Sequence, residues 1–357
     1  MALRCFQKNE ILNYDGYKRR KRLSMDRENT IKQAIVTLAT LTESIEKIIR
    51  GRRDTIDLVL TGLVSGGHVL IEDYPGSGKT TLAKTLGRLI ASSPQSDVKS
   101  HILPFRRIQF TPDLLPSDVL GVNIFDPNTG TFRFQHGPIF AHVVLADEIN
   151  RTGPKVQAAF LECMAERQVT IDNVTHSLDR FFFVIGTQNP LDLAGTYPLP
   201  LVQLDRFLLR IPMSYVGAET ELEILKDSSQ IEKSSSEVVP VVSREEVIIA
   251  QHATAMVHVD QSLLEVIVGL VQETRQSLDL QFGASTRAAI MLKNAVASWA
   301  LIKGRDYATE DDLKFLAPFV LLHRLKFIPG SEQPKQIFEG ILEKQIEKFT
   351  RNAWKGE

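Results

Sequence analysis

The chain carries a glycine-rich turn directly in front of a lysine and two threonines, a pattern that is able to bind phosphate. Gly76 and Gly78 lack a Cβ atom, so the backbone can take dihedral angles that point several N–H groups at one anion. Lys79 adds a positive charge for the β- and γ-phosphates of a nucleotide, and the Thr80 hydroxyl is a ligand for the accompanying Mg²⁺. These residues predict a nucleotide-binding turn that ends in a magnesium ligand.

The segments on either side of this turn are typical of a phosphate-binding loop. Residues 69–71 form an apolar run that predicts a buried strand, and apolar residues at helical spacing follow from Leu82. A helix that begins at the turn directs the positive end of its dipole at the anion. The alternative is an ordinary glycine-rich turn, and the order of strand, turn and helix argues against it. The predicted nucleotide-binding segment consists of Asp73, Tyr74, Pro75, Gly76, Ser77, Gly78, Lys79, Thr80 and Thr81.

Two carboxylates close a second apolar segment. Residues 142–146 predict a buried strand that ends in Asp147 and Glu148. Because ligands bind at the carboxyl edge of an open parallel sheet, we expect this pair beside the phosphate-binding turn. Asp147 would hold Mg²⁺ through water, and Glu148 would polarise the attacking water. A strand that ends in charge for no catalytic reason is the alternative, and the position of the pair downstream of the turn favours a hydrolytic site.

An amide and an arginine complete the set of candidate catalytic residues. Residues 181–187 predict a third buried strand, and Asn189 follows it closely, where its amide can orient a water or contact the γ-phosphate. Arg206 follows a proline-rich loop. It is either a surface charge or an arginine finger that reaches the nucleotide of a neighbouring subunit.

Composition limits the classes of protein to which the chain can belong. Its 357 residues fit two domains, and its formal net charge of −1 gives no overall field that would recruit nucleic acid or an anionic membrane. Cys5 and Cys163 cannot form a disulfide framework, and Cys163 is expected in the core of a helix-packed layer. No apolar run is long enough for a membrane span. These features predict a cytoplasmic protein.

The chain divides into three parts that differ in charge and in hydrophobic pattern. Residues 1–26 form a basic extension that is expected to be disordered, 27–215 an α/β nucleotide-binding domain, and 216–357 an all-α domain. Serines 234–236 are expected in a loop between helices, and Arg287 is expected one turn into a helix. The predicted helices of the last part cover residues 219–226, 244–255, 261–277, 286–303, 310–325 and 334–349.

Long motifs in this order resemble those of the AAA+ ATPases, and within them the MoxR family. The resemblance covers the chain from about residue 27 to about residue 325. It rests on the motifs I-E-D-Y-P-G-S-G-K-T, R-I-Q-F-T-P-D-L-L-P-S-D-V-L-G, L-A-D-E-I-N-R, F-L-E-C-M-A-E-R-Q-V-T, T-Q-N-P, G-T-Y-P-L-P, Q-L-D-R-F and L-L-H-R-L.

The resemblance implies a P-loop NTPase fold, an αβα sandwich with a parallel sheet, followed by a helical lid. It implies that Lys79 and Thr80 are the Walker A lysine and Mg²⁺ ligand, and that Asp147 and Glu148 are the Walker B pair. By the same resemblance Asn189 would be sensor 1, Arg206 the arginine finger acting on the next protomer, and Arg287 the sensor 2 arginine. Residues 121–138 would hold an insertion that faces a central pore.

The family resemblance also implies partners and an activity. It implies a ring, expected to be a hexamer, that uses Mg²⁺ and ATP to remodel, mature or activate client protein complexes together with a von Willebrand factor A domain protein. A nucleic-acid motor is one alternative, but residues 121–138 contain one arginine and an offsetting Asp126. A nucleotide-gated scaffold is another, although it would normally lack Glu148 or the finger.

The chain departs from the strict phosphate-loop pattern at one place and from the family pattern at two. Asp73 stands where the strict phosphate-loop pattern has glycine, Gly186 stands where alanine is more usual, and Leu201 and Val202 replace the usual Glu-Ala. No catalytic group is lost. The last change alters the loop beside Arg206, and with it the details of the subunit contact that the resemblance implies.

Overall fold

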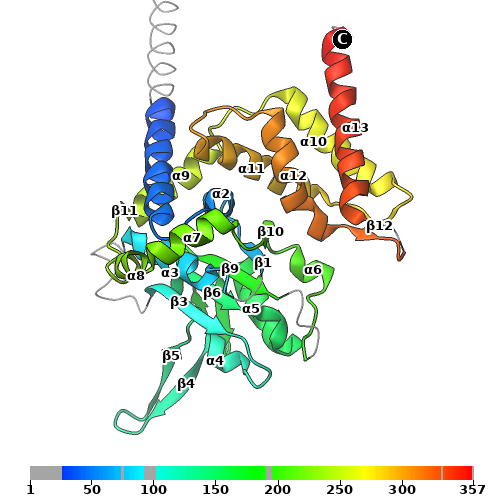
Figure 1. The fold of residues 1–357 in the computed structure, drawn as a ribbon. Coiled ribbons are helices and arrows are strands. Elements are labelled where there is room, and N and C mark those ends of the chain that lie inside the picture. The colour runs from blue at the N-terminus through cyan, green and yellow to red at the C-terminus, as the bar shows by residue number, and fades with distance from the viewer. Residues whose placement is uncertain (1–25, 74–75, 92–101, 190–194, 331–332, 356–357) are drawn as a thin grey trace, which may run out of the picture.

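The centre of the molecule is a five-stranded parallel sheet. The computed structural model describes residues 26–73, 76–91, 102–189, 195–330 and 333–355. The strands of the sheet lie in the order β10-β1-β9-β6-β3 and all neighbouring pairs are parallel. This confirms the predicted P-loop α/β architecture (Figure 1). The strands are β1 (Val69–Asp73), β3 (Leu103–Gln109), β6 (Ala141–Asp147), β9 (Phe183–Gln188) and β10 (Leu209–Met213).

Helices cover both faces of this sheet. Successive residues of each strand point to opposite faces, so alternate residues pack in two different cores. Val143 and Leu145 of β6 belong to a core with α2 (Arg53–Val64) and α3 (Lys79–Leu89). Val144 between them belongs to a second core with Phe160 of α5 (Pro154–Glu166). All seven residues of β6 are buried, as expected for a parallel strand covered on both sides.

The second half of the chain is mainly helical, as predicted. It contains α7 (Ala218–Lys226), α8 (Ser228–Ser236), α9 (Arg244–Thr254), α10 (Gln261–Gln276), α11 (Thr286–Ile302), α12 (Glu310–Leu321), the 3₁₀ turn η2 (Leu322–Arg324) and α13 (Pro334–Lys355). The start of α12 has a capping box in which Thr309 accepts from Asp312 N.

Several details of this half differ from the prediction. Serines 234–236 lie at the end of α8 rather than in a loop, and Arg287 is the second residue of α11 rather than one turn in. Two short strand pairs also occur, which helical periodicity does not predict: β12 (Leu280–Phe282) with β13 (Lys326–Phe327), and β11 (Val242–Ser243) with β2 (Ile90–Ala91) of the first half.

The first described helix, residues 26–46, contributes to two cores, because Leu41 and Ile45 belong to the core that includes the sheet strands while its first half packs on the helices of the second domain. Ile31, Ala34 and Leu38 form a buried cluster with Ala253 of α9 and Leu301 of α11. Of the predicted basic extension, residues 1–25 and Cys5 lie outside the described residues. Among the helices that are described, none is both long and apolar enough to cross a membrane.

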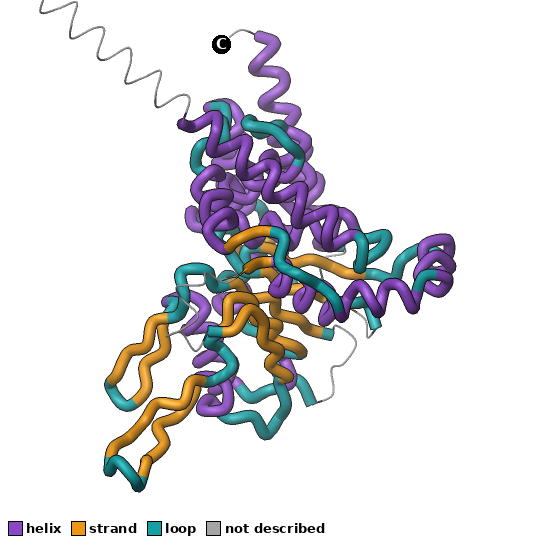
Figure 2. The backbone as a smooth tube through the Cα atoms, turned by 90° about the vertical axis from the view of Figure 1, so that its left-hand side faces the viewer, coloured by secondary structure: helices purple, strands orange, loops and turns teal. Residues whose placement is uncertain are grey.

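Two antiparallel hairpins project from the sheet on the side away from the lid. They are β4 (Gly121–Asp126) with β5 (Thr131–His136), and β7 (Gln168–Ile171) with β8 (Val174–Ser177). Figure 2 shows them side by side. Asn123 Nδ2 donates to Asp172 Oδ2 at 2.7 Å, and the rings of Phe134 and His176 stack with centroids 3.9 Å apart. The first hairpin lies within residues 121–138, where the family resemblance implies an insertion.

The buried side chain of His68, just before β1, forms hydrogen bonds with α5 and with β9. The amide of Val184 donates to His68 Nδ1 at 3.1 Å, so Nε2 carries the proton and donates to Met164 O at 3.2 Å. Burial lowers the pKa of His68 to about 4. The folded protein therefore holds this imidazole neutral at a pH where the unfolded chain protonates it.

We predict that the free energy of unfolding falls as the pH drops from about 6.5 towards 4, because the unfolded state then binds more protons than the folded state. The full shift of His68 corresponds to roughly 3 kcal/mol. Urea unfolding at about pH 7 and about pH 5 should show roughly 2 kcal/mol of this loss, because pH 5 is still above the folded-state pKa, and His68→Gln should weaken the dependence. His258→Gln, which changes an imidazole 66% exposed, is the matched control and should leave the dependence as it is.

Candidate functional site

The phosphate-binding turn has the open backbone that its glycines predicted. Gly76 and Gly78 have φ angles of 83° and 92°, in the left-handed region that favours glycine. Helix α3 begins at Lys79 with Gly78 as its N-cap. A Cβ atom placed on either glycine would meet no heavy atom of the described residues within 4 Å, so the left-handed backbone, and not crowding, is what favours glycine at both positions. Tyr74 and Pro75 of the predicted segment lie outside the described residues.

The Asp147 carboxylate lies at the end of β6 and is held by side chains from three other elements. Lys79 Nζ is 3.5 Å from Oδ1, and Thr187 Oγ1 donates to the same oxygen at 2.7 Å. Arg107 Nη2 of β3 is 2.6 Å from Oδ2. Only 2% of the Asp147 side chain is exposed, and a carboxylate so buried requires this pairing. The structure thus brings the predicted phosphate-binding lysine and the predicted magnesium ligand together.

Glu148 follows in a left-handed conformation, with φ 55° and ψ 50°, that is uncommon for a residue with a side chain. Its backbone N–H donates to Thr187 Oγ1 at 2.9 Å. Its carboxylate accepts from Gln109 Nε2 at 2.8 Å and lies 3.4 Å from Arg151 Nη1. The turn separates the Glu148 side chain from that of Asp147, so the two adjacent carboxylates have different surroundings.

Asn189 directly follows β9, and the sheet order determines its surroundings. Because β9 lies between β1 and β6, Asn189 lies between the strand that leads to the phosphate-binding turn and the strand that ends in Asp147. The preceding Gln188 donates to Glu72 of β1, whose Oε1 also accepts from Arg210 Nη2 at 2.5 Å. These contacts link the carboxyl ends of β1 and β9 to Arg210 near the start of β10.

A cavity of about 400 Å³ opens next to the glycine turn. Its walls come from three distant segments: the turn after the first helix, the phosphate-binding turn and the start of the lid. The lining is mostly apolar and includes Ile48, Ile49, Gly78, Tyr215 and Leu225. Such a cavity suits a planar, partly apolar group attached to a phosphate chain.

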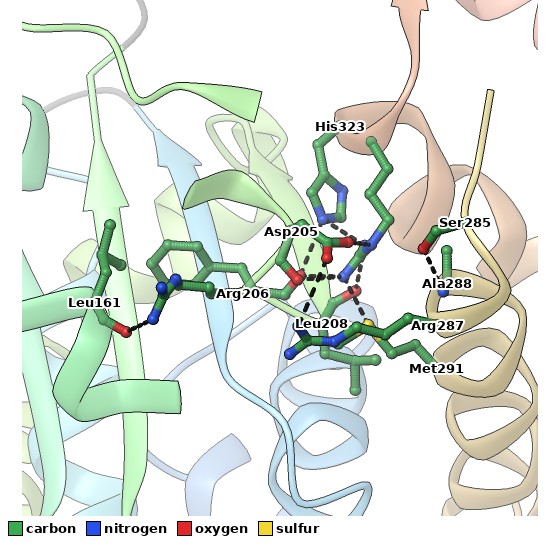
Figure 3. A network of polar contacts seen from close by, with 11 residues as sticks. Leu161, Asp205, Arg206, Leu208, Ser285, Arg287, Ala288, Met291 and His323 are labelled. Carbon is green, nitrogen blue, oxygen red and sulfur yellow. Dashed lines mark hydrogen bonds and ion pairs between the residues drawn. The ribbon is translucent and has the colours of Figure 1, made fainter. Parts of the chain in front are cut away.

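Arg206 and Arg287 belong to a different group of side chains, at the junction of the sheet with the lid. Arg206 lies between α6 (Leu201–Leu204) and β10, and its Nη1 donates to Leu161 O of α5. Arg287 Nη1 lies 3.9 Å from Asp205 Oδ2. Figure 3 shows the two arginines on opposite sides of this segment. Among the described contacts, none joins either arginine to Lys79, Asp147 or Glu148.

The structure shows the environment of the residues that depart from the family pattern. A Cβ on Gly186 would lie 2.9 Å from the Phe207 ring, so glycine at this position lets Phe207 pack against β9. Val202 is 79% exposed on α6, close to Arg206 in the sequence. Cys163 is buried on α5 as predicted, and burial raises the pKa of its thiol to about 12, so it is not a nucleophile at neutral pH.

Several residues of the site were not predicted from the sequence. Arg107 and Gln109 contact the carboxylates from β3, and Thr187 bridges them from β9. The alternation of polar and apolar residues at 107–109 was the available signal, because polar side chains at the end of a strand in this sheet face the ligand edge. The cavity residues gave no such signal, since Ile48 and Ile49 fit the apolar pattern of an ordinary helix.

Comparison with known proteins decides the family. A model described as "ATPase family associated with various cellular activities (AAA)" matches residues 68–209, and one described as "AAA lid domain" matches residues 272–344. Protein YeaC of Bacillus subtilis is 43% identical, covering 89% of this chain and 94% of its own length. Chaperone MoxR1 of Mycobacterium tuberculosis is 37% identical, covering 81% of this chain and 75% of its own. The chain belongs to the MoxR family of AAA+ ATPases.

A solved structure agrees with this assignment over the whole MoxR-type fold. The crystal structure of a candidate ATPase from Cytophaga hutchinsonii is 36% identical and superposes with a TM-score of 0.80. It covers 90% of this chain and 97% of its own. Membership in this family implies nucleotide binding and ATPase activity in general.

The Thr187 hydroxyl offers a test of the site geometry. We predict that Thr187→Val lowers the free energy of unfolding by about 1–3 kcal/mol, because Asp147 and the Glu148 N–H lose a buried partner. ATP turnover should fall about tenfold as both carboxylates shift. Thr187→Ser keeps the hydroxyl, so it should retain most of the free energy of unfolding and most of the turnover. Urea unfolding and steady-state ATPase assays measure the two. A valine variant as stable and active as the parent would contradict this account.

Proposed function

We propose that this MoxR-family protein hydrolyses ATP with Mg²⁺ in an oligomeric ring and uses the energy to remodel client protein complexes. The observation that carries the proposal is the contact of Lys79 and Thr187 with the buried Asp147, beside an open glycine turn. It combines a phosphate-binding group with a metal-binding group in one protomer. A MoxR-type sequence alone would not establish that these groups meet.

The donor set at the turn fits magnesium bound together with a nucleotide. Thr80 at the start of α3 would supply its hydroxyl and Asp147 at the end of β6 would hold the ion through water, which gives Mg²⁺ the oxygen ligands that it prefers. Among the described residues, no cluster of three or more metal-binding side chains of His, Cys, Asp or Glu occurs. This agrees with an ion that takes its remaining ligands from phosphates and water. When bound, Mg²⁺ neutralises charge on the β- and γ-phosphates.

The remaining residues of the protomer have distinct proposed roles. Lys79 and the backbone of the predicted segment, residues 73–81, would bind the phosphates. Glu148, held by Gln109, would orient and polarise the attacking water, and Asn189 would position that water or the γ-phosphate. The 400 Å³ cavity would receive the base and ribose.

A shared site explains why Arg206 lies apart from these groups. We propose that Arg206 reaches the nucleotide of the next protomer in a ring, for which a hexamer is the expected form. Arg287, which lies 3.9 Å from Asp205, would act as the sensor 2 arginine. The exposed Val202 beside Arg206 would lie at that subunit contact.

Proteins rather than nucleic acids are the proposed clients. The β4–β5 hairpin exposes Ile124, Phe125 and Phe132, the last of them 71% exposed, and it carries a single arginine, Arg133. Exposed apolar side chains suit a protein surface, whereas nucleic acid requires several positive charges. A relative bears the name "Chaperone MoxR1". A von Willebrand factor A domain partner and a cytoplasmic location stay predictions from the family resemblance.

Glu148→Gln tests the proposed hydrolysis. The variant should bind ATP with unchanged affinity but lose turnover by about 100-fold or more, because the amide cannot polarise the water. Equilibrium binding and phosphate release measure the two effects separately. Glu166→Gln, at an exposed position of α5, is the matched control and should keep full turnover. Retained hydrolysis in Glu148→Gln would mean that another residue activates the water.

A mixture of two inactive variants tests the shared site. Arg206→Ala should bind nucleotide yet hydrolyse it at least about 100-fold more slowly, and Lys79→Ala should lose binding. Equimolar mixing should restore part of the activity, because some interfaces then combine an intact Lys79 with an intact Arg206. Absence of recovery in a mixed oligomer verified by mass would contradict sharing.

A further inference from the structure

The segment that carries Arg206 is held by an arginine of the lid. Residues 205–208 join α6 to β10, and Arg324 of η2 reaches into them although only 3% of its side chain is exposed. Its Nε donates to Asp205 Oδ1 at 2.8 Å. Asp205 and Arg206 are adjacent, and Figure 3 shows Asp205 facing the lid while Arg206 points the other way, to Leu161.

The same guanidinium also binds the backbone of this segment. Arg324 Nη2 donates to Phe207 O at 2.6 Å and to Asp205 O at 3.3 Å, and Nη1 donates to Leu208 O at 3.2 Å. The neighbouring His323 Nε2 lies 3.0 Å from Phe207 O. The lid therefore contacts the residues before and after Arg206. The hydrogen bond of the Arg206 side chain is instead to Leu161 O of α5.

The other side of the segment is fixed by packing. Phe207 is fully buried and its ring fills the space above Gly186 of β9, the strand that precedes Asn189. The backbone at Arg206 is thus held between a buried ring on the sheet and a buried guanidinium from the lid. A change in either attachment would move Arg206.

We infer that Arg324 is a positioning residue that sets the orientation of Arg206, so that the lid of one protomer controls hydrolysis in its neighbour. This inference rests on the proposed function, in which Arg206 acts on the next nucleotide. Arg324 itself touches neither substrate nor metal. Its effect passes through the backbone at residues 205–208.

The chemistry of the contact favours this role over simple packing. Burial lowers the pKa of Arg324 to about 10, so it is still charged at neutral pH beside Asp205. A buried ion pair is not required for stability, because well-packed apolar residues often serve as well. Only the planar fork of a guanidinium can donate at once to a carboxylate and to three carbonyls of one turn.

Complementation between inactive variants tests the inference. Arg324→Gln should lower kcat about 100-fold by misplacing Arg206, while a fluorescent ATP analogue binds with affinity unchanged within about twofold. Mixed with Lys79→Ala, it should recover activity, because its own Lys79 then faces an undamaged Arg206. Mixed with Arg206→Ala, it should recover none, since neither subunit supplies a working finger.

A merely structural role gives the opposite pattern. If Arg324 supports the nucleotide site of its own protomer, Arg324→Gln should lose analogue binding and should complement Arg206→Ala instead of Lys79→Ala. That result, or full activity of Arg324→Gln, would overturn the inference. The reference mixture of Lys79→Ala with Arg206→Ala separates the two claims. Recovery there without recovery in the Arg324 mixture rejects only the role of Arg324, whereas no recovery there rejects the shared site and the inference with it.

Two further variants control for folding. Asp205→Asn keeps every backbone carbonyl and removes the charge that meets Arg324, so it should fall in the same complementation group if Arg324→Gln does not fold. Arg305→Gln breaks another arginine–aspartate pair of the lid, with Nη2 of Arg305 2.6 Å from Asp312 Oδ1, and does not touch residues 205–208. It should keep kcat, and an equal loss of kcat there would show that any damage to the lid suffices.

Discussion

A buried carboxylate, Asp147, is the constraint on which the rest of the site depends. It lies at the end of a strand that is covered on both faces, where an unpaired charge would be costly. Lys79 of α3, Arg107 of β3 and Thr187 of β9 stabilise the buried carboxylate. The contacts of this one side chain therefore connect three elements to β6. The positive charges of Lys79 and Arg107 that stabilise Asp147 also suit the anionic phosphates of a nucleotide. The same arrangement therefore stabilises the fold and prepares the site.

The order of the strands explains how residues distant in the chain meet. Since β9 lies between β1 and β6, the residues after all three strands reach one edge of the sheet. The neighbouring β10 runs parallel to β1, so residues 205–208, which connect α6 to its start, lie at the opposite edge of the sheet, where Leu208 N donates to His68 O. The helical part of the chain contacts that connection through Arg324 and lines the cavity beside the glycine turn through Ile224 and Leu225. A movement of the lid would affect both places.

Local motifs were predictable from the sequence, and contacts between distant segments were not. Gly76, Gly78 and Lys79 act through their own backbone and through the adjacent helix, so their spacing was sufficient. Thr187 and Arg107 contact Asp147 only because their strands are neighbours in the sheet, and strand order is a property of the whole fold. Serines 234–236 were expected in a loop because serine favours turns, but the chain continues as a helix through them. Arg324 was visible only as part of the motif L-L-H-R-L, which says nothing about Asp205.

The central claim is that the hydrolytic site is completed between protomers, and the rate of Mg²⁺-dependent ATP hydrolysis per protomer tests it directly. The rate should be measured over a series of protein concentrations, with the oligomeric mass determined on the same samples. We expect a rate near zero for the monomer that rises steeply as the oligomer forms and then levels off. A rate that is appreciable for the monomer and independent of concentration would contradict the account, because each chain would then possess a complete site.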